Sequence, residues 1–123
     1  MKIIEALNKF DVLVPNDYSQ SEKIAWLSQV DGIIKNEIID THVDHEEVVF
    51  NGYTDETPLD TNLIVGEPYD ALYLAFLEGQ VCYYNHEFTK YNNSMQVFRD
   101  TLGNFRNYYN RIHAPIRRNI NYI

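Results

Sequence analysis

Hydrophobic residues recur at helical spacing in four separate stretches of the chain. In residues 2–10 the apolar side chains fall on one face of a helix, and Pro15 stands beyond its expected end. Residues 19–41 open with a capping box, in which the Ser19 hydroxyl can accept the amide of Glu22, and apolar positions then follow at helical intervals. The pattern predicts two helices in this part of the chain.

The third and fourth stretches are separated by a short polar link. Residues 68–91 keep apolar side chains at helical spacing, and Pro68 suits a first helical position because its missing amide would have no partner there. Residues 92–94, Asn-Asn-Ser, interrupt the pattern and are expected to cap a fourth helix that runs to about Ile112. So short a link predicts that the last two helices pack as an antiparallel pair.

The segment between the second and third helices is long and acidic. Residues 43–67 contain no lysine or arginine, and the turn dipeptide Asn51-Gly52 between β-forming residues allows a short β-hairpin over residues 48–53. Connections of this length are commonly functional, so we interpret the segment as an acidic interaction loop. Its candidate interface residues are Asp44, Glu46, Glu47, Asp55, Glu56 and Asp60.

The chain of 123 residues has the size of one domain with one core. Hydrophobic residues make up 45% and charged residues 23%, which excludes wholesale disorder. The predicted fold class is all-α: a single helical domain over residues 1–123, built as a small four-helix bundle with the acidic loop inserted and an extended C-terminal tail. The apolar runs are too short for a membrane span, and the start of the chain lacks a signal-peptide pattern, so export is not expected.

Charge is unevenly distributed along the chain. Residues 1–87 hold 17 acids and four lysines, a net of −13, whereas residues 88–123 hold one acid and six basic residues, a net of +5. The overall charge of −8 argues against a general binder of polyanions. A chain with two oppositely charged halves suits head-to-tail association with copies of itself or docking onto a charged partner.

Residues 114–123 form a C-terminal tail that is too short to build a core. Pro115 cannot continue the preceding helix, and the apolar side chains beyond it need another surface. We expect the tail to dock on a partner; the alternative is that it folds back on its own domain. The predicted docking residues are Pro115, Ile116, Arg117, Arg118, Ile120, Tyr122 and Ile123.

Side chains with catalytic or metal-binding potential are few. His42 and His45 could share one side of a helical turn and hold a divalent ion, but their spacing matches no metalloprotease motif, and a solvated helix end explains them without an ion. The single cysteine, Cys82, is expected in the core and not as a nucleophile. The chain contains no phosphate loop and no nucleophile elbow. The sequence therefore predicts neither an enzyme nor a cofactor.

The chain is rich in aromatic residues, with ten tyrosines and six phenylalanines. Tyrosines on the predicted third helix, such as Tyr69, Tyr73, Tyr84 and Tyr91, could stack on the bases of a nucleic acid. Few basic residues lie between them, so packing in the core is the preferred interpretation.

Taken together, short segments along nearly the whole chain resemble small proteins encoded near the capsid genes of tailed phages and prophages of Gram-positive bacteria, which look like head-tail connector, or adaptor, proteins. The segments that carry the resemblance are Trp26-Leu27-Ser28, Asp31-Gly32, Ile34, Glu37-Ile38, Thr41-His42, Phe50-Asn51-Gly52-Tyr53, Pro68-Tyr69-Asp70, Leu72-Tyr73, Tyr91-Asn92-Asn93-Ser94-Met95, Tyr109-Asn110-Arg111, His113 and Pro115.

The resemblance implies a structural virion protein. Such a protein would form a homo-oligomeric ring below the portal, contact the portal and the adjacent head-completion or tail proteins, and let DNA pass through the channel that it lines. Its location would be the virion, and the host cytoplasm during assembly. The alternative is a phage-encoded nucleic-acid-binding or regulatory module, for which the basic C-terminal part would supply the binding surface.

Overall fold

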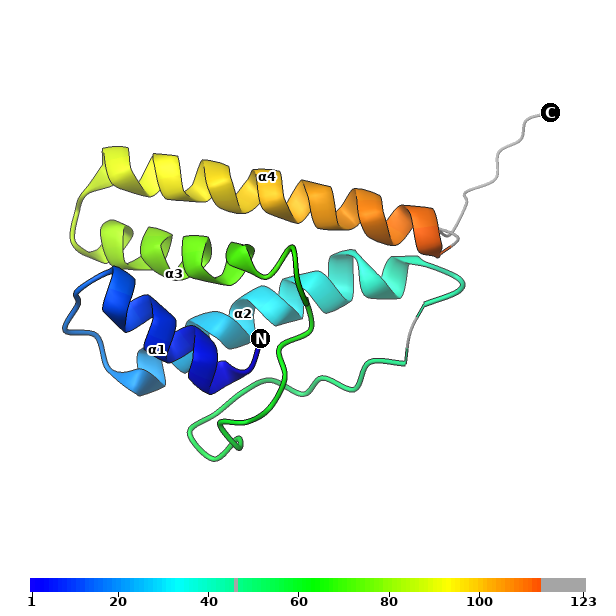
Figure 1. The fold of residues 1–123 in the computed structure, drawn as a ribbon, viewed down its shortest axis with the longest axis horizontal. Helices are drawn as coiled ribbons and strands as arrows, with labels where there is room; N and C mark the ends of the chain where they lie inside the picture. The colour runs from blue at the N-terminus through cyan, green and yellow to red at the C-terminus, as the bar shows by residue number, and fades with distance from the viewer. Residues whose placement is uncertain (46, 114–123) are drawn as a thin grey trace.

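The computed structural model of the chain describes residues 1–45 and 47–113 (Figure 1). It is mostly helical and contains four α-helices, so the all-α prediction is confirmed. Within these described ranges there is no β-strand, and Lys2 and Asn62 form an isolated bridge. In chain order the elements are α1 (Ile3–Leu13), α2 (Gln20–Glu37), the short 3-10 helix η1 (Ile39–Thr41), α3 (Ala71–Tyr84) and α4 (Phe88–Ile112).

The second helix begins where the sequence predicts and ends earlier. α2 starts directly after Ser19, whose hydroxyl accepts the Glu22 amide at 3.1 Å, so the predicted cap is confirmed. The helix stops at Glu37 instead of Thr41. The Thr41 hydroxyl donates to the Ile38 carbonyl at 2.7 Å, and the chain tightens there into η1.

The turn between the last two helices lies at residues 85–87, so the predicted break at residues 92–94 is wrong. α3 ends in a Schellman motif, in which the Glu87 amide donates to the Cys82 carbonyl at 2.8 Å. His86 takes the left-handed position of this motif with φ 61°. Glycine or asparagine usually fills that position, so no familiar helix-ending residue marks the turn in the sequence.

The start of the third helix also differs from the prediction. α3 begins at Ala71, and Pro68 lies before it, in a turn where the Tyr69 amide donates to the Gly66 carbonyl at 3.0 Å. The third helix therefore has 14 residues and the fourth has 25. Asn92, Asn93 and Ser94 lie inside α4.

α3 is the central helix of the molecule. It packs against α1, α2 and α4, and it runs antiparallel to the first part of α4 (Figure 1). The Phe76 and Phe98 rings meet across this pair with centroids 5.1 Å apart. The largest fully buried core side chains are Tyr73, Phe10, Ile3, Ile24, Leu27, Ile34, Ile38, Ile39, Leu72, Leu77, Val30 and Val65.

Part of the acidic loop completes the first helix. The first amides of a helix have no partner within it. In α1 the Ile3 amide donates to the Thr61 carbonyl at 3.0 Å and the Ile4 amide donates to the Leu59 carbonyl at 2.9 Å. The main chain of residues 59–61 therefore caps α1.

The hairpin that the sequence allows over residues 48–53 does not form. Gly52 has a positive φ of 89°, as a turn would need, but the next amide does not pair with a neighbouring strand. The Tyr53 amide instead donates to the Ser28 hydroxyl at 3.0 Å, and the Tyr53 hydroxyl donates to Asp31. Both partners lie on α2, so residue 53 is bound to this helix and not to a second strand.

Two helical glycines are expected to respond differently to alanine. A Cβ on Gly103 would meet no atom within 4 Å, so Gly103→Ala is expected to stabilise the fold by about 0.5–1 kcal/mol through helix propensity. A Cβ on Gly79 would lie 2.7 Å from the Met95 sulfur, so Gly79→Ala is expected to lose that gain to a forced shift of Met95. Urea unfolding of both variants measures the difference, and equal stabilisation would contradict close packing of α3 on α4.

Candidate docking surfaces

The predicted docking tail, residues 114–123, follows the last residue that the structure describes. The described chain ends at His113, whose ring Nδ1 contacts the carbonyl oxygen of Asp44. The tail residues named from the sequence, Pro115, Ile116, Arg117, Arg118, Ile120, Tyr122 and Ile123, lie outside the described residues. The prediction that they dock on a partner stays a prediction.

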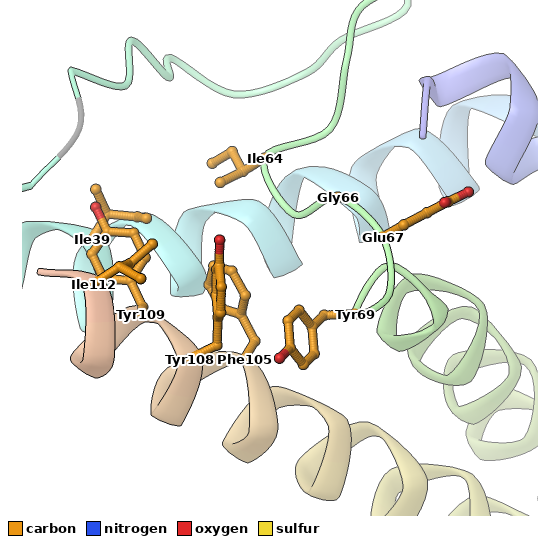
Figure 2. A pocket seen from close by; sticks show the side chains of 9 residues that line it. All are labelled: Ile39, Ile64, Gly66, Glu67, Tyr69, Phe105, Tyr108, Tyr109 and Ile112. Atoms are coloured by element: carbon orange, nitrogen blue, oxygen red, sulfur yellow. The ribbon is translucent and has the colours of Figure 1, made fainter.

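A groove lies beside the C-terminal end of α4 (Figure 2). We call it the α4 groove. It has a volume of about 200 Å³ and is open to solvent. Phe105 and Tyr109 are buried at its base, whereas Tyr108 and Ile112 are exposed. The other residues that line it are Ile39, Ile64, Gly66, Glu67 and Tyr69.

The opposite end of the α3–α4 pair carries an exposed group of aromatic rings. We call Tyr83, Tyr84 and Phe88 the aromatic knob. Their exposed fractions are 48%, 53% and 52%, which is unusual for such large apolar rings. Tyr84 stacks on the buried ring of Trp26 with centroids 6.0 Å apart, and Tyr83 contacts both other knob rings. The knob is therefore an ordered surface that rests on the core.

Tyr84 lies outside the core, which corrects the core interpretation for this residue. Tyr73 is fully buried, as that interpretation requires, and Tyr69 and Tyr91 are partly buried. The aromatic excess of the sequence therefore divides between the core and one exposed end of the molecule.

The acids of the predicted interaction loop do not gather into one cluster. Asp44 lies beside His113 at the end of α4. Asp55 accepts a hydrogen bond from the Ser21 hydroxyl at 2.7 Å, at the start of α2. Glu46 lies outside the described residues. The remaining predicted loop acids, Glu47, Glu56 and Asp60, are exposed.

A buried carboxylate fastens the second half of this loop to the helices. Asp31 on α2 is fully buried and accepts hydrogen bonds from the Tyr53 and Tyr73 hydroxyls, both at 2.5 Å, and from the Ile64 amide at 3.1 Å. The Tyr73 hydroxyl also accepts the Val65 amide at 2.8 Å. Burial raises the pKa of Asp31, and the hydrogen bonds oppose that rise. This network is not among the features predicted from the sequence.

The two histidines considered as metal ligands have different surroundings. His42 is buried, its Nδ1 donates to the Ile38 carbonyl at 2.6 Å, and its Nε2 lies 2.6 Å from the side-chain amide of Asn110. The Nδ1 contact is local and the Nε2 contact links the segment after η1 to α4, so both nitrogens are engaged and neither is free for a metal. His45 is exposed. In the part of the chain that the structure describes, no three or more His, Cys, Asp or Glu side chains form a group that could hold a metal ion.

Cys82 is buried, as the sequence predicts, and is expected to react slowly. Burial raises the pKa of its thiol, and the charges of Glu78 and Glu87 add to the rise. A thiol reagent at neutral pH should label the folded chain at least about tenfold more slowly than the same chain in concentrated urea. Equal rates in the two conditions would show that Cys82 is accessible.

α4 carries the positive charge of the described residues. Lys90, Arg99, Arg106 and Arg111 lie on it with a single acid, Asp100. The three arginines are exposed, and none forms an ion pair with another described residue. The Arg111 guanidinium lies over the Tyr108 ring, 6.0 Å from its centroid. The helix therefore offers unpaired cations to a partner.

No protein-family model, curated protein or solved structure significantly matches this chain. Among the described residues, none of the helices is both long and apolar enough to span a bilayer.

The charged segments of these surfaces are visible in the sequence, whereas two other features are not predicted from it. The aromatic knob was not predicted, because its position depends on the turn at residues 85–87. The Asp31 network does have a signal in the sequence. Asp31 is four residues after Leu27 and three before Ile34, so it lies on the same helix face as these apolar residues. A carboxylate in such a row requires buried partners.

Proposed function

We propose that this chain is a structural virion protein of a tailed phage or prophage, a head-tail connector or adaptor. In this role it forms a homo-oligomeric ring below the portal, joins the head to the tail and lines the channel through which DNA passes. It acts in the virion and, during assembly, in the host cytoplasm. The finer architecture we propose for it is a small four-helix bundle with residues 43–67 as an inserted loop and residues 114–123 as an extended docking tail.

The observation that carries the proposal is the separation of charge between α4 and the rest of the molecule. α4 is cationic with exposed arginines, and the tip of the acidic loop lies at the opposite edge of the molecule (Figure 1). Subunits with complementary faces can associate head to tail, and such contacts close into rings when the rotation between subunits allows it.

The charge balance also supports a role beside DNA. The described loop acids are exposed, and acids that face a channel repel phosphates and so let DNA slide. The docking tail supplies a second contact, to the portal or to a head-completion or tail protein, in which Arg117 and Arg118 pair with acids on the receiving surface.

Disruption of the coding gene in a phage or prophage that produces particles tests the proposal. A connector is required only after heads and tails have formed, so filled or emptied heads and free tails are expected to accumulate unjoined, with rescue by the intact gene. Electron microscopy of the lysate measures this. Complete particles in the absence of the protein, or loss of the heads themselves, would contradict the connector role.

The alternative function is a nucleic-acid-binding or regulatory module. The observation that favours it is the set of three exposed arginines on α4, of which Arg111 lies over the Tyr108 ring. A gel-shift titration of the purified chain with duplex and single-stranded DNA at several salt concentrations tests it. Tight binding that weakens steeply with salt would favour this function over the connector.

A further inference from the structure

We propose that the aromatic knob of one copy of this chain docks in the α4 groove of the next copy. The inference rests on the proposed function for the presence of neighbouring copies, and it assigns the two surfaces that join them. The docking element is Tyr83, Tyr84 and Phe88, and the receiving element is the groove next to Tyr108 and Ile112 (Figure 2).

The two surfaces cannot meet within one molecule. Phe88 is the first residue of α4 and Ile112 is the last, and α4 has 25 residues. At a rise of 1.5 Å per residue the helix holds them about 37 Å apart. The knob and the groove therefore lie at opposite ends of α4, and only a second copy can bring them together (Figure 1).

The groove is large enough for one ring of the knob, and its lining combines polar and apolar surface. A dry cavity of about 150 Å³ holds one benzene ring, so a groove of about 200 Å³ has room for one aromatic side chain of the knob. Phe88 is 52% exposed and Ile112 is 47% exposed, so both leave apolar area in water in the isolated chain. A ring in the groove would rest on Phe105 and Tyr109 at its base, and an aromatic anchor in a well-packed pocket is the usual centre of a protein interface.

Exposed cations at the groove end have an acidic counterpart on the knob side. Arg106 and Arg111 stand exposed on the groove end of α4, and Glu22 lies beside Tyr84 in a shallow hollow on the knob side. Both ends also carry opposing charges. Lys90 pairs with Glu87 at 2.9 Å on the knob side, while Glu67 borders the groove and Asp44 lies beside His113 at the groove end. Arg106 and Arg111 form no ion pair with another described residue, so they can pair with Glu22 and stack on incoming rings.

A contact of this kind joins different patches of identical subunits. It is a heterologous contact, so it repeats from one subunit to the next and produces either a closed ring or an open filament. The proposed connector ring requires a contact of this class. A twofold dimer would instead bury the same patch twice and leave the other patch free.

The test uses full-length chains with one exposed residue changed. Phe88→Ser removes one exposed ring of the knob, Ile112→Ser removes an apolar edge of the groove, and Val97→Ser, at a 53% exposed position in the middle of α4, is the matched control. Tyr83→Ser is a second knob variant for the case in which Phe88→Ser lowers the thermal midpoint. Sedimentation velocity over a range of concentrations measures the assembly of each chain.

The wild type and Val97→Ser are expected to associate alike, while each surface variant weakens association about 30-fold or more. A mixture of the knob variant with the groove variant retains one intact contact per pair. The mixture is therefore expected to form dimers that cannot grow, although each variant alone stays monomeric.

The outcomes separate this inference from the proposed function. If the wild type assembles and the surface variants assemble equally well, the docking inference is overturned and the ring proposal stands. If these surfaces join the subunits but the products are open filaments on their own and in the presence of heads, the inference stands and the connector proposal fails. A wild-type chain that stays monomeric at about 1 mM overturns the docking inference.

Discussion

Replacement of Asp31 by alanine is expected to lower the free energy of unfolding by about 3–5 kcal/mol, a large part of the stability of a domain of this size. The wild-type carboxylate accepts hydrogen bonds from two tyrosine hydroxyls and from the Ile64 amide. Alanine leaves these three donors in the interior without their acceptor. Urea unfolding followed by circular dichroism measures the loss.

Two further variants make this result interpretable. Asp17→Ala changes an exposed acid between α1 and α2 and is expected to alter the stability by less than about 0.5 kcal/mol. Tyr53→Phe removes only one of the donors to Asp31 and is expected to cost about 1–2 kcal/mol, which keeps the test usable if Asp31→Ala does not fold. If Asp31→Ala is as stable as Asp17→Ala, the network does not hold the loop.

The same carboxyl group predicts a pH dependence. Burial raises the pKa of Asp31 above its ordinary value of 3.8, so the folded chain binds this proton more tightly than the unfolded chain does. The stabilisation that comes from this proton is fully present at a pH below the ordinary pKa of Asp31. It is lost as the pH rises through the raised pKa of the folded chain. As the pH falls from neutral toward 4, the wild type should therefore gain stability relative to Asp31→Asn, which cannot titrate there. A relative loss of wild-type stability would indicate that the hydrogen bonds outweigh burial.

Deletion of residues 115–123 is expected to abolish the joining of heads to tails while the subunit stays folded. Among the described residues the core is formed by α1 to α4 together with Ile38, Ile39, Leu63 and Val65, and the tail adds apolar side chains that a docking role assigns to a partner. Thermal unfolding of the truncated chain should change by only a few degrees. Complementation of a disrupted phage gene by the truncated gene should yield no complete particles.

A matched control distinguishes binding of the tail through its ion pairs from binding through its apolar side chains. Arg117→Ala with Arg118→Ala retains the length and the apolar residues of the tail and tests the ion pairs alone, so partial loss of assembly is expected. If the truncated chain unfolds, the tail belongs to its own domain. If the truncated chain supports normal particles, the docking assignment is wrong.

The sequence was sufficient to predict the helices and insufficient to place the turn between the last two. Ser19 and Glu22 are only three residues apart, so the cap that they form could be predicted from the sequence alone. The turn at residues 85–87 leaves no such pattern, because α3 and α4 bury facing surfaces and the apolar spacing continues across it. The left-handed position of the turn is occupied by His86 and not by glycine or asparagine, so no residue typical of a helix end marks the turn.

The candidate surfaces were predictable only to the extent that they are local in sequence. The exposed loop acids and the cationic residues of α4 could be identified by charge alone. The α4 groove could not, because it combines Ile39, Ile64 and Phe105 from three distant segments. The same holds for the contact of His42 with Asn110, which lie 68 positions apart. Such contacts depend on how the helices pack.

The main-chain cap on α1 affects which changes residues 59–61 can tolerate. The Thr61 and Leu59 carbonyls that receive the first amides of α1 are present whatever the side chains are, so most substitutions should leave the cap intact. Deletion of one residue just before them would move these carbonyls by about 3.3 Å, beyond hydrogen-bonding reach. We therefore expect related chains to vary freely in composition over this stretch and to conserve its length.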